Sequence, residues 1–183
     1  RPVAKEFMEK FATAMGSFVM GRGRDAGVQL GASVSVKERN KIAELVDNSI
    51  KAGAKVLTGG KTPDGPGAFY PATVLEVDKK AEILNHEVFG PVAPIVIFDK
   101  DEEGIELANS TDFGLISYVY SQDLKRAIQI SEAIESGMVA INRGMISDPA
   151  APFGGVKQSG LGREGGFDGI HEFLETKYIG VEI

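Results

Sequence analysis

Six glycines fall within the fifteen residues 152–166, which run Pro152-Phe-Gly-Gly-Val-Lys-Gln-Ser-Gly-Leu-Gly-Arg-Glu-Gly-Gly166. Glycine costs backbone entropy on folding, but it permits tight turns and close approach of another segment. So many glycines together mean that the chain turns sharply or passes close to something here. The sequence therefore predicts an ordered loop, the glycine-rich loop (residues 152–166), that packs on a core; a loop that shapes an active site is the alternative.

Within this loop, Gly160-x-Gly162-x-x-Gly165 matches the phosphate-binding pattern of dinucleotide-binding units. That pattern requires a strand directly before it and a helix directly after it, in a β-α-β unit of about 30 residues. Polar residues 157–159 precede the match, and the nearest apolar strand, residues 138–142, lies well upstream. Residues 166–183 are too few to complete the unit. We therefore reject a dinucleotide fold at this position.

The bulk composition indicates one globular domain of 183 residues, with 43% hydrophobic and 25% charged residues. The net charge of −6 argues against a nucleic-acid partner, and no apolar run approaches the ~18 residues of a membrane span. The absence of cysteine excludes disulfides, thiolate metal sites and a cysteine nucleophile within the chain. His86 and His171 lack metal-ligand spacing, so no metal site is predicted. A cytoplasmic location is the plain expectation.

Apolar spacing predicts an α/β fold. Residues 2–15 repeat apolar side chains at helical spacing. A second helix begins at the capping box Ser35-x-x-Glu38 and ends at Gly53. Strands and helices then alternate, which favours a three-layer arrangement, a largely parallel sheet with helices on both faces. Strands are expected at residues 54–58, 69–77, 94–98, 117–120 and 138–142, and further helices at 101–109 and 123–137.

Residues 175–183 alternate apolar and polar side chains and end the chain, which predicts a terminal strand. An unpaired strand edge is a liability unless another sheet accepts it. One solution is to add the strand to a neighbouring subunit's sheet. We therefore expect residues 1–174 as the main domain and residues 175–183 as an oligomerisation strand.

Candidate binding residues precede a buried strand in the segment Asn85-His-Glu-Val-Phe-Gly-Pro-Val92. The Gly-Pro turn places Glu87 and Phe89 at a strand edge, where α/β proteins tend to bind ligands. The carboxylate can accept hydrogen bonds from sugar hydroxyls, and the ring can lie against a flat cofactor. On the residues alone, a solvated Glu87 and a core Phe89 are the simpler alternative.

Several motifs in order give the chain a family resemblance along nearly its whole length. His86-Glu-Val-Phe-Gly-Pro91, Gly114-Leu115, Asn142 and the glycine-rich loop resemble the C-terminal part of an aldehyde dehydrogenase. Within that family, residues 144–148 and the loop look most like the members that oxidise succinate semialdehyde. The resemblance implies the family's catalytic-domain fold, an NAD or NADP cofactor and a small aldehyde substrate.

The resemblance also implies residue roles. Glu87 would hold the ribose of the nicotinamide nucleotide, and Phe89 would pack beside the nicotinamide ring. Phe153 would line the aldehyde tunnel, Ser147 would help to bind the substrate carboxylate, and Asn142 would lie near the site. The last strand would join a neighbouring subunit's sheet, which implies a homo-oligomer.

The departures from the family are equally informative. The nucleophilic cysteine, the general-base glutamate, the oxyanion-hole asparagine and the basic residues of the carboxylate pocket have no counterpart here. Because a thiolate must attack the aldehyde, we expect a fragment of a longer enzyme that carries no catalytic residue and is inactive alone. Two alternatives stay open: another aldehyde specificity, and a non-enzymatic binding or assembly module. The sequence does not choose between NAD and NADP.

Overall fold

The computed structural model describes all residues, Arg1–Ile183. The chain forms two compact units, Arg1–Asp99 and Lys100–Ile183. The boundary expected after residue 174 falls inside the second unit, and a separate terminal domain stays a prediction. No helix has the length and apolar character needed to cross a membrane.

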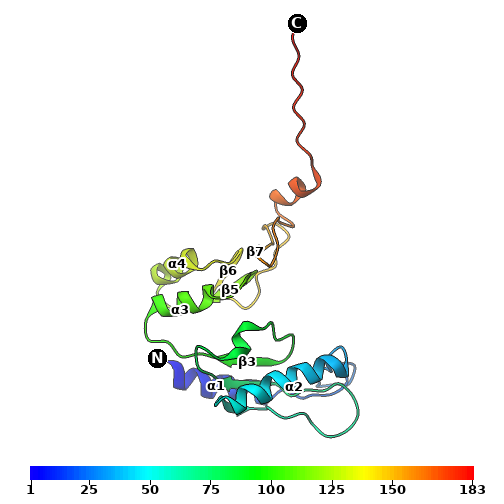
Figure 1. Cartoon of the computed structure of the whole chain (residues 1–183), viewed down its shortest axis with the longest axis vertical. Helices are drawn as coiled ribbons and strands as arrows, with labels where there is room; N and C mark the ends of the chain where they lie inside the picture. The colour runs from blue at the N-terminus through cyan, green and yellow to red at the C-terminus, as the bar shows by residue number, and fades with distance from the viewer. The chain divides into compact units, whose positions relative to one another are not determined.

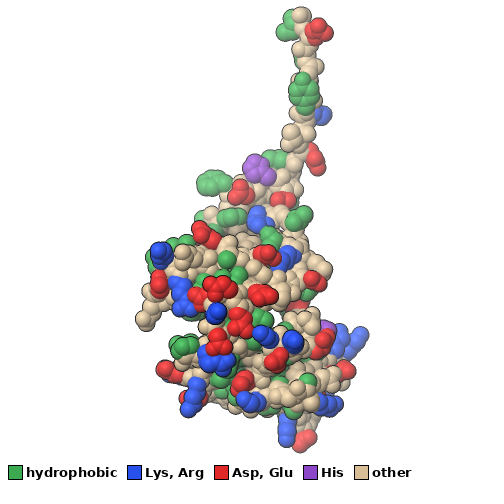
Figure 2. Space-filling view, turned by 60° about the vertical axis from the view of Figure 1, so that its left-hand side comes forward, with side chains coloured by type: hydrophobic (Ala, Val, Ile, Leu, Met, Phe, Trp, Pro, Cys, Tyr) green, Lys and Arg blue, Asp and Glu red, His purple; other side chains and the backbone are tan.

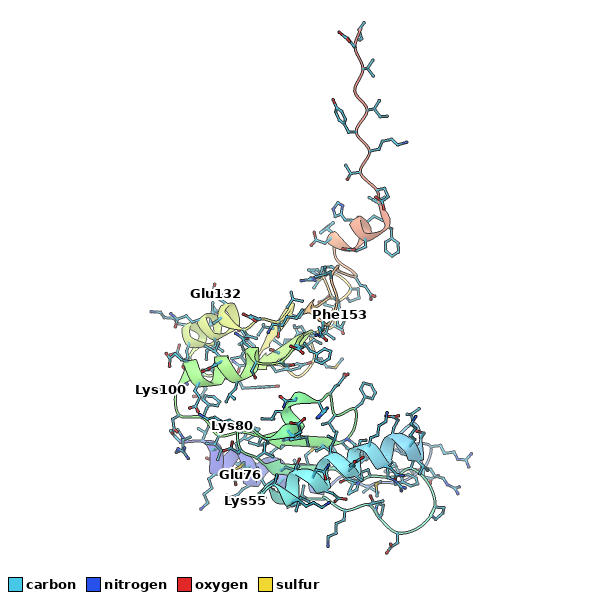
Figure 3. All side chains as sticks on the ribbon, in the orientation of Figure 1. Lys55, Glu76, Lys80, Lys100, Glu132 and Phe153 are labelled. Carbon is cyan, nitrogen blue, oxygen red and sulfur yellow. The ribbon has the colours of Figure 1, made fainter.

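The first unit combines two helices with a three-stranded mixed sheet of order β1-β2-β3 (Figure 1). β1 pairs antiparallel with β2, and β2 pairs parallel with β3. Lys55 and Glu76 form an ion pair of 3.1 Å across β1 and β2 (Figure 3). The elements in chain order are α1 (Ala4–Gly16), α2 (Val36–Lys51), β1 (Lys55–Thr58), β2 (Thr73–Glu76), the 3-10 turn η1 (Glu82–Asn85) and β3 (Val92–Ile95).

Helix α2 begins where its capping signal predicts. Ser35 has extended backbone angles, and its hydroxyl accepts a hydrogen bond of 3.1 Å from the Glu38 amide. This satisfies one of the amides that a helix N-terminus leaves without a partner. Gly53, at a φ of 102°, follows the last turn, in the backbone region that glycine adopts at no steric cost.

The apolar face of α2 forms the core of this unit with β2 and η1. Its buried members are Ile42, Val46, Tyr70, Leu75, Val77 and Ile83. Tyr70 is 1% exposed, and its hydroxyl has no hydrogen-bond partner. Burial, with a smaller contribution from the charge of Asp47, raises the pKa of Tyr70 to about 12. The nearby Thr73 hydroxyl lowers the pKa of Tyr70 slightly. The Thr73 hydroxyl proton itself is donated to the Pro71 carbonyl.

The second unit contains a β-α-β segment in which parallel strands β5 and β6 are joined through α4. Asp123 caps α4 by accepting a hydrogen bond of 3.1 Å from the Arg126 amide. The Arg126 guanidinium also donates to Asp101 at the start of α3, which holds the pKa of that carboxyl below its usual range. The elements are α3 (Asp101–Asn109), β4 (Phe113–Gly114), β5 (Ile116–Val119), α4 (Leu124–Ala133), β6 (Met138–Ile141), β7 (Val156–Lys157) and the 3-10 helix η2 (Asp168–Phe173).

The α/β class is confirmed, but the strands do not form the largely parallel sheet that their alternation with helices suggested. Antiparallel pairs β1-β2 and β4-β7 accompany the parallel pairs β2-β3 and β5-β6. The three-stranded sheet is therefore mixed, because the loop of residues 59–72 returns the chain antiparallel from β1 to β2, and β7 within the glycine-rich loop pairs antiparallel with β4. The three-layer arrangement over the whole chain stays a prediction.

Residues 175–183 form no helix or strand within this chain, and every one of them is exposed (Figure 1, red). Hydrophobic side chains along this segment stand without cover (Figure 2). Tyr178, Ile179 and Val181 are each more than two-thirds exposed, at 92%, 73% and 78%. An oligomerisation strand at this position needs a partner from outside the chain and stays a prediction.

Candidate functional site

The loop of residues 86–91 presents Glu87 and Phe89 to solvent. Val88, between them, packs against the core of the first unit and anchors the loop. Alternation along an extended chain then directs Glu87 and Phe89 away from that core. Phe89 is 85% exposed, so the interpretation of Phe89 as a core aromatic is wrong. No hydrogen bond or ion pair occupies the exposed Glu87 carboxylate.

Glycine at position 90 allows this loop to lie directly on α2. A Cβ atom on Gly90 would sit 2.4 Å from Ile42 Cδ1, closer than real Cβ contacts. The next residue extends the attachment to β2, because the Thr73 amide donates to the Pro91 carbonyl at 2.8 Å. The loop is thus seated on a helix and a strand, and its two outward side chains project from a fixed base.

The chemistry of these side chains fits a nicotinamide nucleotide. A free carboxylate accepts hydrogen bonds from the hydroxyls of a ribose, and charge-assisted hydrogen bonds of this kind are strong. An exposed aromatic ring offers a flat apolar face to a flat ring. Glu87 and Phe89 are thus available for the two contacts that the sequence predicted, although neither contact is itself observed.

The glycine-rich loop has the turn-rich geometry that its composition predicts. Gly160, Gly162, Gly165 and Gly166 all have positive φ angles, between 59° and 97°. No α-helix starts at these glycines; the next element is the 3-10 helix η2. The prediction that these glycines do not belong to a β-α-β dinucleotide-binding unit is confirmed.

Gly137 and Gly154 allow the glycine-rich loop to cross over the residue directly before β6. A Cβ on Gly137 would sit 2.1 Å from the Gly154 carbonyl oxygen and 2.8 Å from the Gly155 Cα. Just before this crossing, Phe153 and Glu164 exchange two backbone hydrogen bonds of 2.7 Å each. The close approach of Gly137 to Gly154 and the backbone hydrogen bonds to Glu164 fix the backbone at Phe153 and directly after it; Figure 3 labels Phe153.

Half-buried Phe153 lines a pocket of about 370 Å³ in the second unit. Arg163 closes one side by donating to the carbonyls of Gly155 and Gly162, at 2.8 and 2.7 Å. The remaining wall is a mixture of apolar and polar side chains with exposed backbone. The lining residues are Leu115, Phe153, Gly154, Gly155, Ser159, Leu161, Gly162, Arg163, Glu164, Glu172 and Phe173.

The other two predicted substrate residues lie outside this pocket lining. Ser147 is exposed in a segment without helix or strand. Asn142 directly follows β6, with a φ of 54°, and its side-chain amide is already paired with the backbone of Ser121. The side-chain oxygen accepts from the Ser121 amide at 2.9 Å, and the side-chain nitrogen donates to the Ser121 carbonyl at 2.8 Å. Asn142 therefore ties β6 to the turn after β5, and its contact with substrate stays a prediction.

A second hollow, of about 610 Å³, lies between α1 and β1. None of the predicted site residues belongs to it. It is lined by Lys5, Met8, Glu9, Ala12, Thr13, Gly16, Leu57 and Thr58.

Sequence reasoning missed the residues that hold the glycine-rich loop in place. Arg163 and Lys157 both donate to backbone carbonyls there, and Gly137 accommodates the crossing. Basic side chains within a glycine run are the one signal that could have identified the first two. Nothing local to Gly137 indicates its role, because the segment that crosses it comes later in the chain.

The model of the aldehyde dehydrogenase family matches residues 1–179. The chain belongs to the aldehyde dehydrogenase family. A succinate-semialdehyde dehydrogenase from Paenarthrobacter nicotinovorans is 51% identical over 98% of this chain and 40% of that enzyme. A glutarate-semialdehyde dehydrogenase from Pseudomonas putida is 42% identical over 97% of this chain and 37% of that enzyme.

Two further similarities concern cofactors. The NADP(+) succinate-semialdehyde dehydrogenase GabD of Escherichia coli is 42% identical over 97% of this chain and 37% of that enzyme. The structure of PnpE in complex with nicotinamide adenine dinucleotide aligns with a TM-score of 0.90 and 38% identity, covering 96% of this chain and 37% of PnpE. The chain thus spans less than half the length of each of these relatives.

Proposed function

We propose that this chain is part of an NAD- or NADP-dependent dehydrogenase that oxidises succinate semialdehyde to the dicarboxylic acid. The observation that carries this proposal is the 51% identity to a succinate-semialdehyde dehydrogenase over 98% of the chain. The accessible Glu87 and Phe89 and the pocket beside Phe153 give the proposal a physical basis.

The two units bind different partners in this proposal, the cofactor in the first and the aldehyde in the second. In the first, the Glu87 carboxylate accepts hydrogen bonds from the ribose and Phe89 lies beside the nicotinamide, whose chemistry when bound is to accept hydride. In the second, Phe153 lines the aldehyde tunnel and Ser147 contacts the substrate carboxylate, with Asn142 shaping the backbone nearby.

The substrate proposal is tested by kinetics of the intact enzyme with three aldehydes. Succinate semialdehyde, glutarate semialdehyde and uncharged butanal separate the effects of chain length and of terminal charge. The expected order of kcat/KM is succinate semialdehyde first and butanal last. Glutarate semialdehyde is the second candidate because its dehydrogenase is 42% identical over the same region. A preference for butanal would reject both semialdehydes.

The chain itself is expected to be inactive because it contains no cysteine to attack the aldehyde. The purified chain is mixed with succinate semialdehyde and either cofactor, and the absorbance of the reduced nicotinamide is followed. Turnover above background would contradict this proposal. If the coding sequence began at Arg1, the remaining alternative, a non-enzymatic binding or assembly module, would be favoured instead.

We also propose that residues 175–183 associate with another subunit of a homo-oligomer. Support comes from the alternating apolar residues of this segment and from the lack of any cover over them within the chain. Sedimentation of the full chain and of a version that ends at residue 174 tests this. A monomer in both cases would contradict it.

A further inference from the structure

Lys157 occupies an unusual backbone position in the glycine-rich loop. Its φ angle is 56°, in the region that side chains disfavour and glycine tolerates. The loop uses glycine at its other four positive φ angles, yet here it carries lysine. A strained non-glycine residue persists only when its surroundings compensate for the strain, so the side chain of Lys157 should make compensating contacts.

The Lys157 ammonium makes three such contacts, one for each of its protons. Nζ donates to the Asn109 carbonyl at 2.8 Å and to the Thr111 carbonyl at 3.2 Å. It also lies 2.6 Å from Glu135 Oε2, and the side chain is 24% exposed. Asn109 is the last residue of α3, where terminal carbonyls carry partial negative charge and favour a cation.

Neighbouring backbone contacts extend this attachment along the loop. Lys157 pairs with Phe113 in the short β4-β7 ladder. The Gln158 amide donates to the Asp112 carbonyl at 2.9 Å, and the Gly114 amide donates to Ser159 Oγ at 3.0 Å. Residues 156–159 are therefore bound side by side with residues 109–114, and Lys157 supplies the only charged contact among these.

This attachment ends close to the pocket. The wall formed by Phe153, Gly154, Gly155 and Ser159 runs between two fixed points. One is the backbone bridge of Phe153 to Glu164, and the other is the set of contacts around Lys157. Loss of the contacts around Lys157 would leave residues 154–156 held mainly by their close packing against Gly137 and by the hydrogen bonds of Arg163.

We propose that Lys157 is a positioning residue for the aldehyde pocket, which sets the place of Phe153 by fixing the loop to the end of α3. It touches neither substrate nor cofactor and acts through the backbone of residues 153–156. This inference rests on the proposed function, because it takes the pocket beside Phe153 as the aldehyde site. The nucleotide contacts at Glu87 and Phe89 belong to the other unit and should not depend on Lys157.

The kinetic test uses four variants of the intact enzyme. Lys157→Met keeps the apolar stem but removes the charge, and Lys157→Gly removes the side chain while suiting the positive φ. Lys157→Arg restores a cation, and Lys125→Met is the control, because Lys125 is an exposed lysine on α4. For the Met and Gly variants the aldehyde KM should rise by up to about tenfold, the limit reached when the whole free energy of the lost charged hydrogen bond appears as displacement of the loop. The cofactor KM should stay unchanged in both variants. Lys157→Arg should have an aldehyde KM between that of wild type and that of Lys157→Met, and Lys125→Met should match wild type.

A second measurement does not require activity. Hydrogen exchange in the intact enzyme should become faster at the amides of Gly114, Phe153 and Glu164 in Lys157→Met, and unchanged in Lys125→Met. If no aldehyde is turned over by wild type, the proposed function fails, while exchange at Phe153 still decides the positioning role.

Two results would overturn the inference. Unchanged exchange at Phe153 and Glu164 would mean that Lys157 does not hold the pocket wall. An equal rise in the aldehyde and cofactor KM, together with a lower melting temperature, would show a general structural role instead.

Discussion

Replacement of Gly137 by alanine should destabilise the second unit, because no space exists for a single methyl group. The new Cβ would lie 2.1 Å from the Gly154 carbonyl oxygen, more than an ångström short of ordinary contact, which begins at 3.4 Å. Both the oxygen and the nearby Gly155 Cα are backbone atoms. Relief therefore requires movement of the main chain and not rotation of a side chain.

The magnitude follows from two opposing effects. Forcing extra volume into a packed site costs typically about 1–3 kcal/mol. Alanine restricts the unfolded chain and returns about 0.4–1 kcal/mol, since φ at Gly137 is not in the positive range. The net loss is about 1–2 kcal/mol, which for a unit of this size corresponds to a melting temperature lower by roughly 4–16 °C.

The assay is thermal unfolding of the full chain followed by far-ultraviolet circular dichroism, since the chain has no tryptophan. Gly144→Ala is the matched control in the same unit. A Cβ on Gly144 would meet only the Tyr120 hydroxyl, at 3.8 Å, so stability equal to wild type or higher by up to about 1 kcal/mol is expected. A Gly137→Ala melting temperature within 2 °C of this control would refute the argument, because the crossing would then have room that the structure denies.

Three further outcomes are expected. Tyr70→Phe should leave stability at pH 7 unchanged or raise it by up to about 1 kcal/mol, because it removes a buried hydroxyl without a partner. Since burial raises the pKa of Tyr70 to about 12, the unfolded chain ionises first above pH ~10. The free energy of unfolding of wild type should therefore fall by up to roughly 2–3 kcal/mol between pH 10 and 12, and that of Tyr70→Phe should not show this loss. Urea titrations at each pH measure both values. An equal fall in the two proteins would contradict the prediction. Ser35→Ala should cost about 1 kcal/mol in urea unfolding, whereas Ser35→Asp, which also caps, should not. In the intact enzyme, Glu87→Gln should raise the cofactor KM about tenfold or more through the lost charged hydrogen bonds, and an unchanged cofactor KM would remove Glu87 from the site.

Local signals predicted those elements that depend on neighbours in sequence. Helix α2 begins at Ser35 because its cap needs only a hydroxyl and an amide three residues later. Helix α4 begins after Asp123, whose carboxylate accepts a hydrogen bond from the amide three residues later. Both predictions are confirmed, and α3 has the bounds that the sequence suggested.

Elements set by distant partners were placed less well. Strand β3 was expected at residues 94–98 but forms at Val92–Ile95, because pairing with Thr73–Glu76 of β2 fixes its limits. Proline at position 94 is accommodated because β3 lies at the edge of its sheet. The β4-β7 ladder was not predicted at all, since it joins residues far apart in the sequence.

Within the candidate site, too, local features were predicted better than contacts between distant residues. On the residue types alone a core Phe89 was the simpler interpretation, and only the family resemblance implied outward-facing contacts for Glu87 and Phe89, with which their exposure is compatible. For Asn142 the sequence suggested a place near substrate, but its amide pairs with the backbone of Ser121. That partner could not be identified from sequence spacing, because it depends on β5 and β6 lying side by side.

The crossing of Gly137 and Gly154 also limits how the pocket can be re-engineered. A side chain at either position would collide with backbone, since a Cβ on Gly154 would lie 2.3 Å from the Gly162 carbonyl oxygen. A mutant library that varies both glycines would consist largely of misfolded members. Variation confined to Phe153 and Leu161 changes the lining of the same pocket without disturbing the crossing. A search for variants that change the ligand preference of this pocket should therefore vary these two side chains and keep the glycines fixed.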